Sequence, residues 1–97
     1  MDLNMIIEKM QSTDYRERFK AEYYQLKDRY EKLKAFNNKI EAANATDYRG
    51  PVNGLEMKQV EMPKHDCPEF MLREQQRIMG EYLHILEVRA VIEGVEL

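Results

Sequence analysis

The chain has 97 residues, the length of a single domain, with 34% charged residues and a formal net charge of -3 at pH 7. This acidic balance argues against a protein that coats a nucleic-acid polymer, and no apolar run approaches the roughly 20 residues needed to span a bilayer. The single cysteine, Cys67, excludes an internal disulfide and suits a reducing cytoplasm.

A short amphipathic helix is predicted at the start of the chain, over residues of about 2–11. Its apolar residues follow the i, i+3, i+4, i+7 spacing of one helix face: Leu3, Ile6, Ile7 and Met10. The polar tripeptide Gln11-Ser12-Thr13 then interrupts this pattern, so we expect the helix to end there.

A long helix is predicted over residues of about 14–43. Thr13 or Asp14 is a suitable N-cap, and Glu17 stands three residues after Asp14, as in a capping box. The apolar residues that follow are spaced by alternating steps of four and three, which is a heptad seam: Phe19, Tyr23, Leu26, Tyr30, Leu33 and Ile40. Asn37 fills the slot where an apolar residue is missing, and a polar residue there usually fixes the register of the packed helices.

A loop of residues 44–66 and a final helix of about 67–93 complete the expected elements. Glycine and proline break both periodicities in the loop, where a short strand or hairpin arm is expected around residues 55–62. Asp66 is a suitable cap for the final helix, with Pro68 in its first turn and Gly94 just past its end.

The final helix carries two apolar stripes side by side. One consists of Leu72, Met79, Leu83 and Leu86, and the other of Met71, Ile78, Tyr82, Ile85 and Ile92. One partner helix covers a single stripe, so we expect a homo-oligomer. Its interface would use Leu72, Ile78, Met79, Tyr82, Leu83, Ile85 and Leu86. The alternative is a three-helix monomer in which the N-terminal helix covers the second stripe.

Charge supports the pairing of the two long helices. Residues 14–41 hold eight Lys/Arg and six Asp/Glu, whereas residues 66–97 hold three Lys/Arg and seven Asp/Glu, so the two halves attract each other within or between chains. The predicted fold is therefore all-α: one domain, residues 1–97, forming a long antiparallel helical hairpin with a short N-terminal helix and a long inter-helix loop. We expect it to assemble into a homo-oligomeric helical bundle.

The tetrapeptide Thr-Asp-Tyr-Arg occurs twice, at residues 13–16 and 46–49. The first copy begins a helix, whereas Gly50 and Pro51 follow the second copy at once, so a true repeat is not supported. Both copies nevertheless place a Tyr-Arg pair at an end of the long helix. We expect an antiparallel oligomer to bring Tyr15-Arg16 of one subunit near Tyr48-Arg49 of another.

Aromatic and basic residues alternate in the first half of the long helix. Tyrosine rings stack on bases, and arginine forks bind phosphates. The candidate ligand-binding residues are Tyr15, Arg16, Arg18, Lys20, Tyr48 and Arg49. The alternative is that the aromatic residues are only the helix seam and the charges its solvated flanks.

No catalytic or metal-binding pattern is found in the sequence. His65-Asp66-Cys67 invites a zinc interpretation, but a zinc site needs about four ligands, and only His84 remains as a further histidine. Helix capping explains these residues better. Glycine loops that bind phosphate, zincin helices and nucleophile elbows are also missing from the sequence. We therefore expect a non-enzymatic protein without a cofactor.

Two stretches carry a resemblance to a known family: RFKAEYYQLKDRYEKLKAFNNKIEAA and MPKHDCPEFMLREQQRIMGEYLHILEVRAVIEGVEL. Together they resemble small helical accessory proteins of tailed phages and prophages of gut Firmicutes, related to an accessory protein of crAss-like phages. Residues 46–60 look like an insertion relative to many relatives. The resemblance implies a phage accessory protein that is made in the cytoplasm of the bacterial host and disables a host defence.

Two functions from different classes remain open. The first is a helical oligomer that sequesters a nucleotide immune signal, either a cyclic oligonucleotide or an ADP-ribose-type molecule. The second is an interaction module that binds and inhibits a host protein, for which the seven adaptable methionines are suited. An enzyme is a distant third, because no set of residues supports a named reaction.

Overall fold

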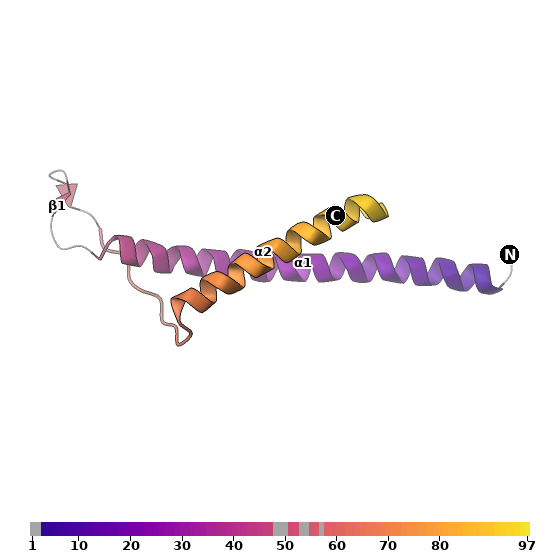
Figure 1. The fold of residues 1–97 in the computed structure, drawn as a ribbon, viewed down its shortest axis with the longest axis horizontal. Coiled ribbons are helices and arrows are strands. Elements are labelled where there is room, and N and C mark those ends of the chain that lie inside the picture. Colours follow the sequence, from indigo (N-terminus) through magenta and orange to yellow (C-terminus); the bar gives the residue numbers. More distant parts are fainter. Residues whose placement is uncertain (1–2, 48–50, 53–54, 57) are drawn as a thin grey trace.

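The computed structural model describes the backbone of residues 3–47, 51–52, 55–56 and 58–97, and the side chains of residues 14–47 and 58–97 (Figure 1). Its elements are, in chain order, the helix α1 (Leu3–Ala45), the strands β1 (Pro51–Val52) and β2 (Leu55–Glu56), and the helix α2 (Glu69–Glu93). The two short strands pair antiparallel, with Pro51 opposite Glu56 and Val52 opposite Leu55. No helix among the described residues is both long and apolar enough to cross a membrane.

The two helices pack against each other as an antiparallel hairpin, as the sequence predicts. Asn44, near the end of α1, donates to Glu69 at the start of α2, and Tyr15 donates to Glu93 at the end of α2. The helices cross obliquely, and the N-terminal part of α1 extends beyond the end of α2 (Figure 1).

The N-terminal helix and the long helix are one element in the structure. The sequence predicts a break at residues 11–13, but α1 continues through them. Glutamine, serine and threonine each cost less than about 0.7 kcal/mol in a helix interior, so three of them in a row do not end a helix that longer flanking segments favour. Asp14 is consequently not a cap, and it forms an i, i+4 ion pair of 3.2 Å with Arg18.

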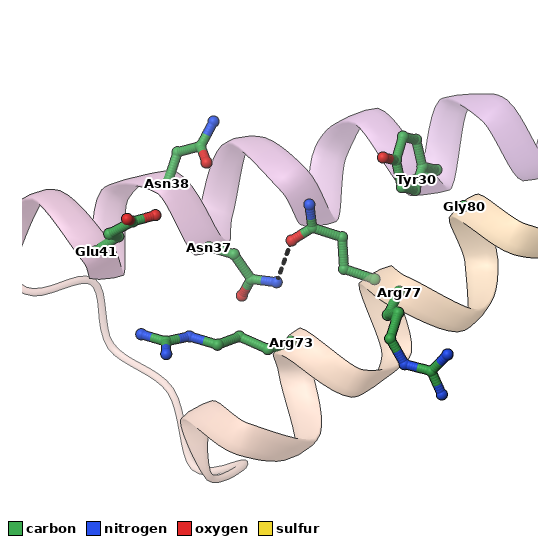
Figure 2. A pocket seen from close by; sticks show the side chains of 8 residues that line it. Tyr30, Asn37, Asn38, Glu41, Arg73, Arg77 and Gly80 are labelled. Atoms are coloured by element: carbon green, nitrogen blue, oxygen red, sulfur yellow. Dashed lines mark hydrogen bonds between the residues drawn. The ribbon is translucent and has the colours of Figure 1, made fainter.

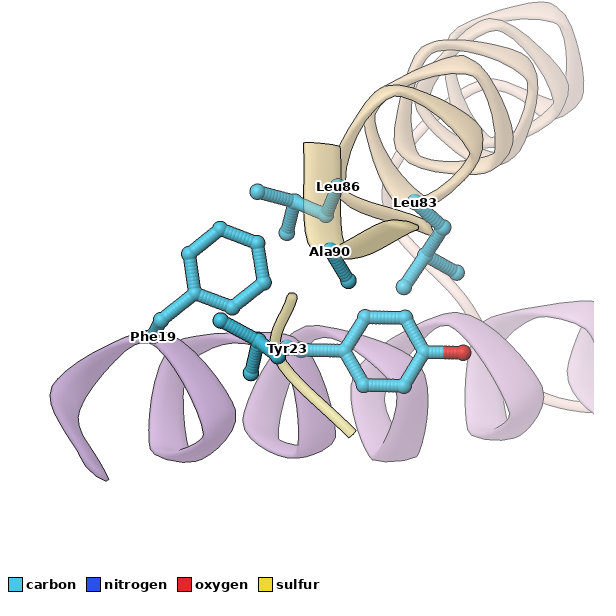
Figure 3. Close-up of a cluster of buried hydrophobic side chains, with 6 residues drawn as sticks. Phe19, Tyr23, Leu83, Leu86 and Ala90 are labelled. Atoms are coloured by element: carbon cyan, nitrogen blue, oxygen red, sulfur yellow. The ribbon is translucent and has the colours of Figure 1, made fainter. Parts of the chain in front are cut away.

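The main hydrophobic core lies where α2 crosses the middle of α1. Figure 3 shows rings from α1 facing aliphatic side chains from α2, and the buried cluster consists of Phe19, Tyr23, Leu83, Leu86, Ala90 and Val95. Gly94 adopts a left-handed conformation at φ 71°, and this turn lets the Val95 amide donate to the Ala90 carbonyl at 2.8 Å. The chain therefore turns back at Gly94, and Val95 joins the core.

A second contact region lies toward the end of α1. Ile40 and Ala43 are buried there, and Phe36 meets the ring of His65 edge-on at 6.0 Å. The hydroxyl of Thr46 accepts a hydrogen bond of 2.9 Å from the Val60 amide. These contacts attach the segment before α2 to α1, and they therefore set where α2 begins.

The two apolar stripes of α2 have different environments. Leu83 and Leu86 are buried against α1, and Leu72 and Met79 are half-buried. The second stripe is exposed in this chain: Met71 51%, Ile78 52%, Tyr82 42%, Ile85 54% and Ile92 76%. Four of the seven residues that the sequence assigns to an oligomer interface thus pack within the chain, which leaves Ile78, Tyr82 and Ile85 on the open face.

Candidate functional site

A polar groove lies between α1 and α2 on one flank of the hairpin. It consists of two adjoining cavities of about 370 and 220 Å³, and Tyr30 and Gly80 line both of them. The larger cavity is also lined by Asn37, Asn38, Glu41, Arg73, Gln76 and Arg77, most of which Figure 2 shows around the space between the helices. The smaller cavity continues toward Lys27, Glu31, Leu83, His84 and Glu87. We refer to the two cavities together as the polar groove.

Gly80 is the residue that brings the ring of Tyr30 close to α2. A Cβ atom at position 80 would lie 3.3 Å from Cε2 of Tyr30, which is closer than an ordinary van der Waals contact. Because glycine has no side chain, the ring can lie against the backbone of α2 at the point where the two cavities meet. The polar groove therefore has an aromatic wall in its middle.

Asn37 is the buried polar residue of the polar groove. It is only 7% exposed, and its amide nitrogen donates to the Leu72 carbonyl at 3.1 Å and to Oε1 of Gln76 at 2.9 Å. Its side-chain oxygen is also buried, and it accepts no hydrogen bond from the described residues. Asn37, the polar residue in the heptad seam of α1, is thus hydrogen-bonded to two groups of α2.

Two arginines line the larger cavity, and they differ in how far carboxylates neutralise them. Arg77 is bonded to Glu74 and Glu81 on its own helix, and these contacts raise the pKa of Arg77 and lower the pKa of Glu74. Arg73 is less engaged, because the nearest carboxylate oxygen, on Glu69, lies 3.9 Å away and its side chain is 59% exposed. Arg73 is therefore the better placed of the two to bind an incoming anion.

The polar groove suits a small ligand that combines anionic groups with a flat ring. Guanidinium groups bind phosphate oxygens, amides bind the edges of a base, and a tyrosine face stacks on a ring. The larger cavity falls within the range of about 300–1,000 Å³ typical of small-molecule sites. Among the described residues, no three His, Cys, Asp or Glu side chains gather as a metal site would require.

The ligand-binding residues predicted from the sequence lie elsewhere. Tyr15, Arg16, Arg18 and Lys20 are on α1, near the end of α2 and away from the polar groove, and Arg18 pairs with Asp14. Tyr48 and Arg49 lie outside the described residues, as does their expected approach to Tyr15-Arg16 of another subunit.

Tyr15 takes part in a contact between the two helices. Its hydroxyl donates to Glu93 at 2.6 Å and accepts from Arg89 at 2.7 Å, and Arg89 also lies over the ring of Phe19 at 5.2 Å. The hydrogen bond to Glu93 is the main reason that the pKa of Tyr15 is raised. Tyr23 and Tyr82 donate to Glu87 and Glu22 in the same way. These tyrosines therefore join α1 to α2, which supports the interpretation of the aromatic residues as a helix seam.

Sequence reasoning missed the α2 side of the polar groove, namely Arg73, Gln76, Arg77 and Gly80. One signal was present. Gly80 interrupts an otherwise strongly helical stretch, and a glycine inside a helix often marks a close approach of another group. The sequence could not show that this group is Tyr30, because that depends on how far α1 and α2 are shifted along each other.

Comparison with known proteins identifies a family. A family model described as Sequestin matches residues 13–51 and 52–92, which together make up most of the chain. The boundary between the two matched segments falls within the connection between α1 and α2. No curated protein and no solved structure matches the chain significantly.

Proposed function

The chain belongs to the Sequestin family, and from this premise we propose that it binds a small nucleotide signal in the polar groove and sequesters it without chemical change. The family description is consistent with a sequestering role. The nucleotide is either a cyclic oligonucleotide or an ADP-ribose-type molecule.

The observation that carries this proposal is the pairing of arginines with an aromatic wall in one cavity. Arg73 and Arg77 line the larger cavity, and Tyr30 lies at its junction with the smaller one. Phosphates would bind at the arginines, and a base would stack on the accessible part of the Tyr30 ring. A nucleotide has both groups at a spacing of a few ångströms, whereas a simple anion uses only the arginines.

Counter-defence in a bacterial host is the biological setting that we propose. Its support is the resemblance of residues 14–97 to phage accessory proteins together with the family description, which is consistent with a sequestering role. A protein that only holds a signal needs no catalytic group. It must instead be present in excess over the signal and retain it tightly.

We further propose that the protein acts as a homo-oligomer, with a second copy covering the exposed stripe of α2. This stripe consists of Met71, Ile78, Tyr82, Ile85 and Ile92, all at least 42% exposed. Apolar surface of this extent along a helix usually marks an interface. The opposite net charges of residues 14–41 and 66–97 favour an antiparallel approach of a second copy.

A thermal-shift panel of cyclic dinucleotides, cyclic trinucleotides and ADP-ribose tests the proposed function. A ligand present at about 100 times its Kd should stabilise the protein by about 2.7 kcal/mol. Recovery of the intact ligand after heating the complex would show that no chemistry occurs. A folded protein that none of these nucleotides stabilises would contradict the proposal.

A pair of double variants locates the binding site. Arg73→Ala with Arg77→Ala removes the two arginines of the polar groove, whereas Arg16→Ala with Arg18→Ala removes two arginines of the sequence-predicted cluster. We expect the first pair to abolish the ligand-induced shift and the second to leave it. The reverse result would move the site to the start of α1. Arg29→Ala, at an exposed position of α1, controls for the loss of one positive charge.

A second candidate function, binding to a host protein, is favoured by one observation. Val91 is 83% exposed and Phe70 is 70% exposed, and neither belongs to the stripe proposed for self-association. A single stoichiometric protein captured from bacterial lysate, and retained after nuclease treatment and dialysis, would favour this function. Capture that depends on these two side chains would assign the partner to this surface.

A further inference from the structure

We propose that Asn37 reads the base of the bound nucleotide, with its side-chain oxygen accepting a hydrogen bond from an amino group on the base edge. This inference rests on the proposed function, because it concerns the same groove. It narrows the ligand class to nucleotides whose base bears an amino group, such as adenine. The basis is the geometry around one buried amide.

The orientation of the Asn37 amide is fixed by its neighbours. Both hydrogens of the nitrogen are used, one by the Leu72 carbonyl at 3.1 Å and the other by Oε1 of Gln76 at 2.9 Å. A flipped amide would place its oxygen against the Leu72 carbonyl, and two acceptors would then face each other. The oxygen is therefore held as an acceptor in one direction.

That oxygen is buried and has no donor among the described residues, in a side chain that is 7% exposed. A buried polar atom without a partner is costly, and native proteins usually satisfy such an atom or use it in binding. Asn37 is one of the residues that line the larger cavity, and Figure 2 shows its side-chain oxygen on the side where Arg73 lies. A donor that entered the cavity would remove this cost.

Arg73 is the residue that would hold the phosphate of the ligand near Asn37. Its guanidinium group is exposed and has only the distant carboxylate of Glu69, at 3.9 Å, as an ion-pair partner among the described residues. It can therefore turn toward a phosphate, and such a turn would open a path from the cavity to the oxygen of Asn37. A nucleotide that engages Arg73 through phosphate would bring its base close to the oxygen of Asn37.

The test compares two ligands that differ only in the amino group. ADP-ribose and its analogue with unsubstituted purine in place of adenine have the same charge and nearly the same shape. We expect calorimetry to give a roughly tenfold weaker affinity for the purine analogue, as befits one net hydrogen bond. Equal affinities would overturn the role of Asn37 and leave the proposed function intact. Failure of both ligands, and of every cyclic nucleotide in the thermal-shift panel, to bind the folded protein would overturn both proposals.

A variant tests whether Asn37 is the residue that causes the preference for ADP-ribose over its purine analogue. Asn37→Leu removes the acceptor and places an apolar residue in the helix seam, which packed helices tolerate well. We expect this variant to bind both ligands with the same affinity, whereas Gln25→Leu, an exposed amide elsewhere on α1, should keep the tenfold preference. Retained discrimination in folded Asn37→Leu would overturn the inference. If this variant does not fold, the comparison of the two ligands on the unaltered protein still tests the inference, because equal affinities would overturn it.

Discussion

Gly80 lies within α2 and Gly94 directly follows its end, and the structure uses the two glycines for different reasons. Gly80 has ordinary helical backbone and is needed for space beside Tyr30, whereas Gly94 has a φ of 71° and is needed for its conformation. Substitution by alanine therefore tests the space beside Tyr30 at position 80 and the left-handed backbone conformation at position 94. The two substitutions form a matched pair.

Gly80→Ala should keep or raise stability and weaken nucleotide binding. Alanine gains about 1 kcal/mol over glycine in a helix interior, and the ring of Tyr30 can tilt by a few tenths of an ångström to relieve the contact at 3.3 Å. The tilted ring and the new methyl group would narrow the polar groove. We expect an unchanged or higher Tm and an affinity reduced about tenfold, or ~1.4 kcal/mol.

Gly94→Ala is the matched control for this prediction. Alanine is strained at positive φ, so the variant should lose roughly 1 kcal/mol of stability. Position 94 is not part of the polar groove, and the affinity for nucleotide should stay the same. Equal losses of affinity in both variants would mean that Gly80 acts only through stability.

Glu93 should make the hairpin sensitive to acid. Hydrogen bonds from Tyr15 and then Arg89 lower the pKa of Glu93 below its ordinary value of 4.5. The folded state therefore favours the carboxylate, and this stabilisation is complete above pH 4.5 and is lost as the pH falls through the lowered pKa. In urea titrations from pH 7 to pH 3, we expect Glu93→Gln to be less stable at pH 7 and to lose less stability on acidification.

Glu96→Gln provides the comparison, because Glu96 is exposed three residues beyond Glu93. It should follow the unaltered protein across the whole pH range. The same acid response in Glu93→Gln and in the unaltered protein would show that the contact between Tyr15, Arg89 and Glu93 is not maintained in solution. Salt should weaken the effect, since all three side chains meet at the surface.

At the scale of the elements, the hairpin depends on a narrow line of buried contacts. Leu86 is 1% exposed and lies in the cluster with Phe19 and Tyr23, whereas Val88, two residues later, is 44% exposed. Leu86→Ala should cost about 2–5 kcal/mol, a large part of the 5–15 kcal/mol typical of a folded domain. Val88→Ala should stay within about 0.5 kcal/mol.

Thermal unfolding followed by circular dichroism at 222 nm measures both variants. The protein concentration must be the same in every experiment, because self-association would contribute to the apparent stability. A loss in Val88→Ala as large as that in Leu86→Ala would mean that the described core is not the main contact between α1 and α2.

The seam of α1 is predictable from the sequence because it depends on local spacing. Phe19, Tyr23 and Ile40 are buried where the alternating steps of four and three place them, and Asn37 is the buried polar member. The same holds for the two stripes of α2, one covered by α1 and one open. Periodicity thus identifies which face of each helix is apolar.

The polar groove and the inter-helix hydrogen bonds could not be predicted in the same way. Gly80 lies beside Tyr30, and Glu93 lies beside Tyr15, only because α1 and α2 pack in one particular register. Contacts of the connection, such as the hydrogen bond between Thr46 and Val60, contribute to that register together with the bonds of Asn37 to α2. The continuity of α1 through residues 11–13 was missed for another reason, since weak propensities at a few positions cannot outweigh two strong helical segments.

At the scale of the whole molecule, the chain is far from globular. Its radius of gyration is 21.4 Å and its extents are 77 × 28 × 16 Å, whereas a compact domain of this length would have a radius of gyration of about 12.5 Å. A pair of helices of this shape has one shared core and leaves the outer face of each helix open. The exposed stripe of α2 is part of this open surface, and we propose that the helices of a second copy cover it.

We therefore expect the native particle to be heavier than the 11.6 kDa chain, and the double variant Ile78→Lys with Ile85→Lys to reduce it to a monomer. Both side chains are more than half exposed and lie on the stripe, so lysine there should leave the hairpin helical while repelling a second copy. Val91→Lys introduces the same side chain at an 83% exposed position outside the stripe and should leave the mass unchanged. Native mass spectrometry with circular dichroism separates dissociation from unfolding. A monomeric mass for the unaltered protein would contradict the assembly while leaving the polar groove, which lies within one chain, as the site to test.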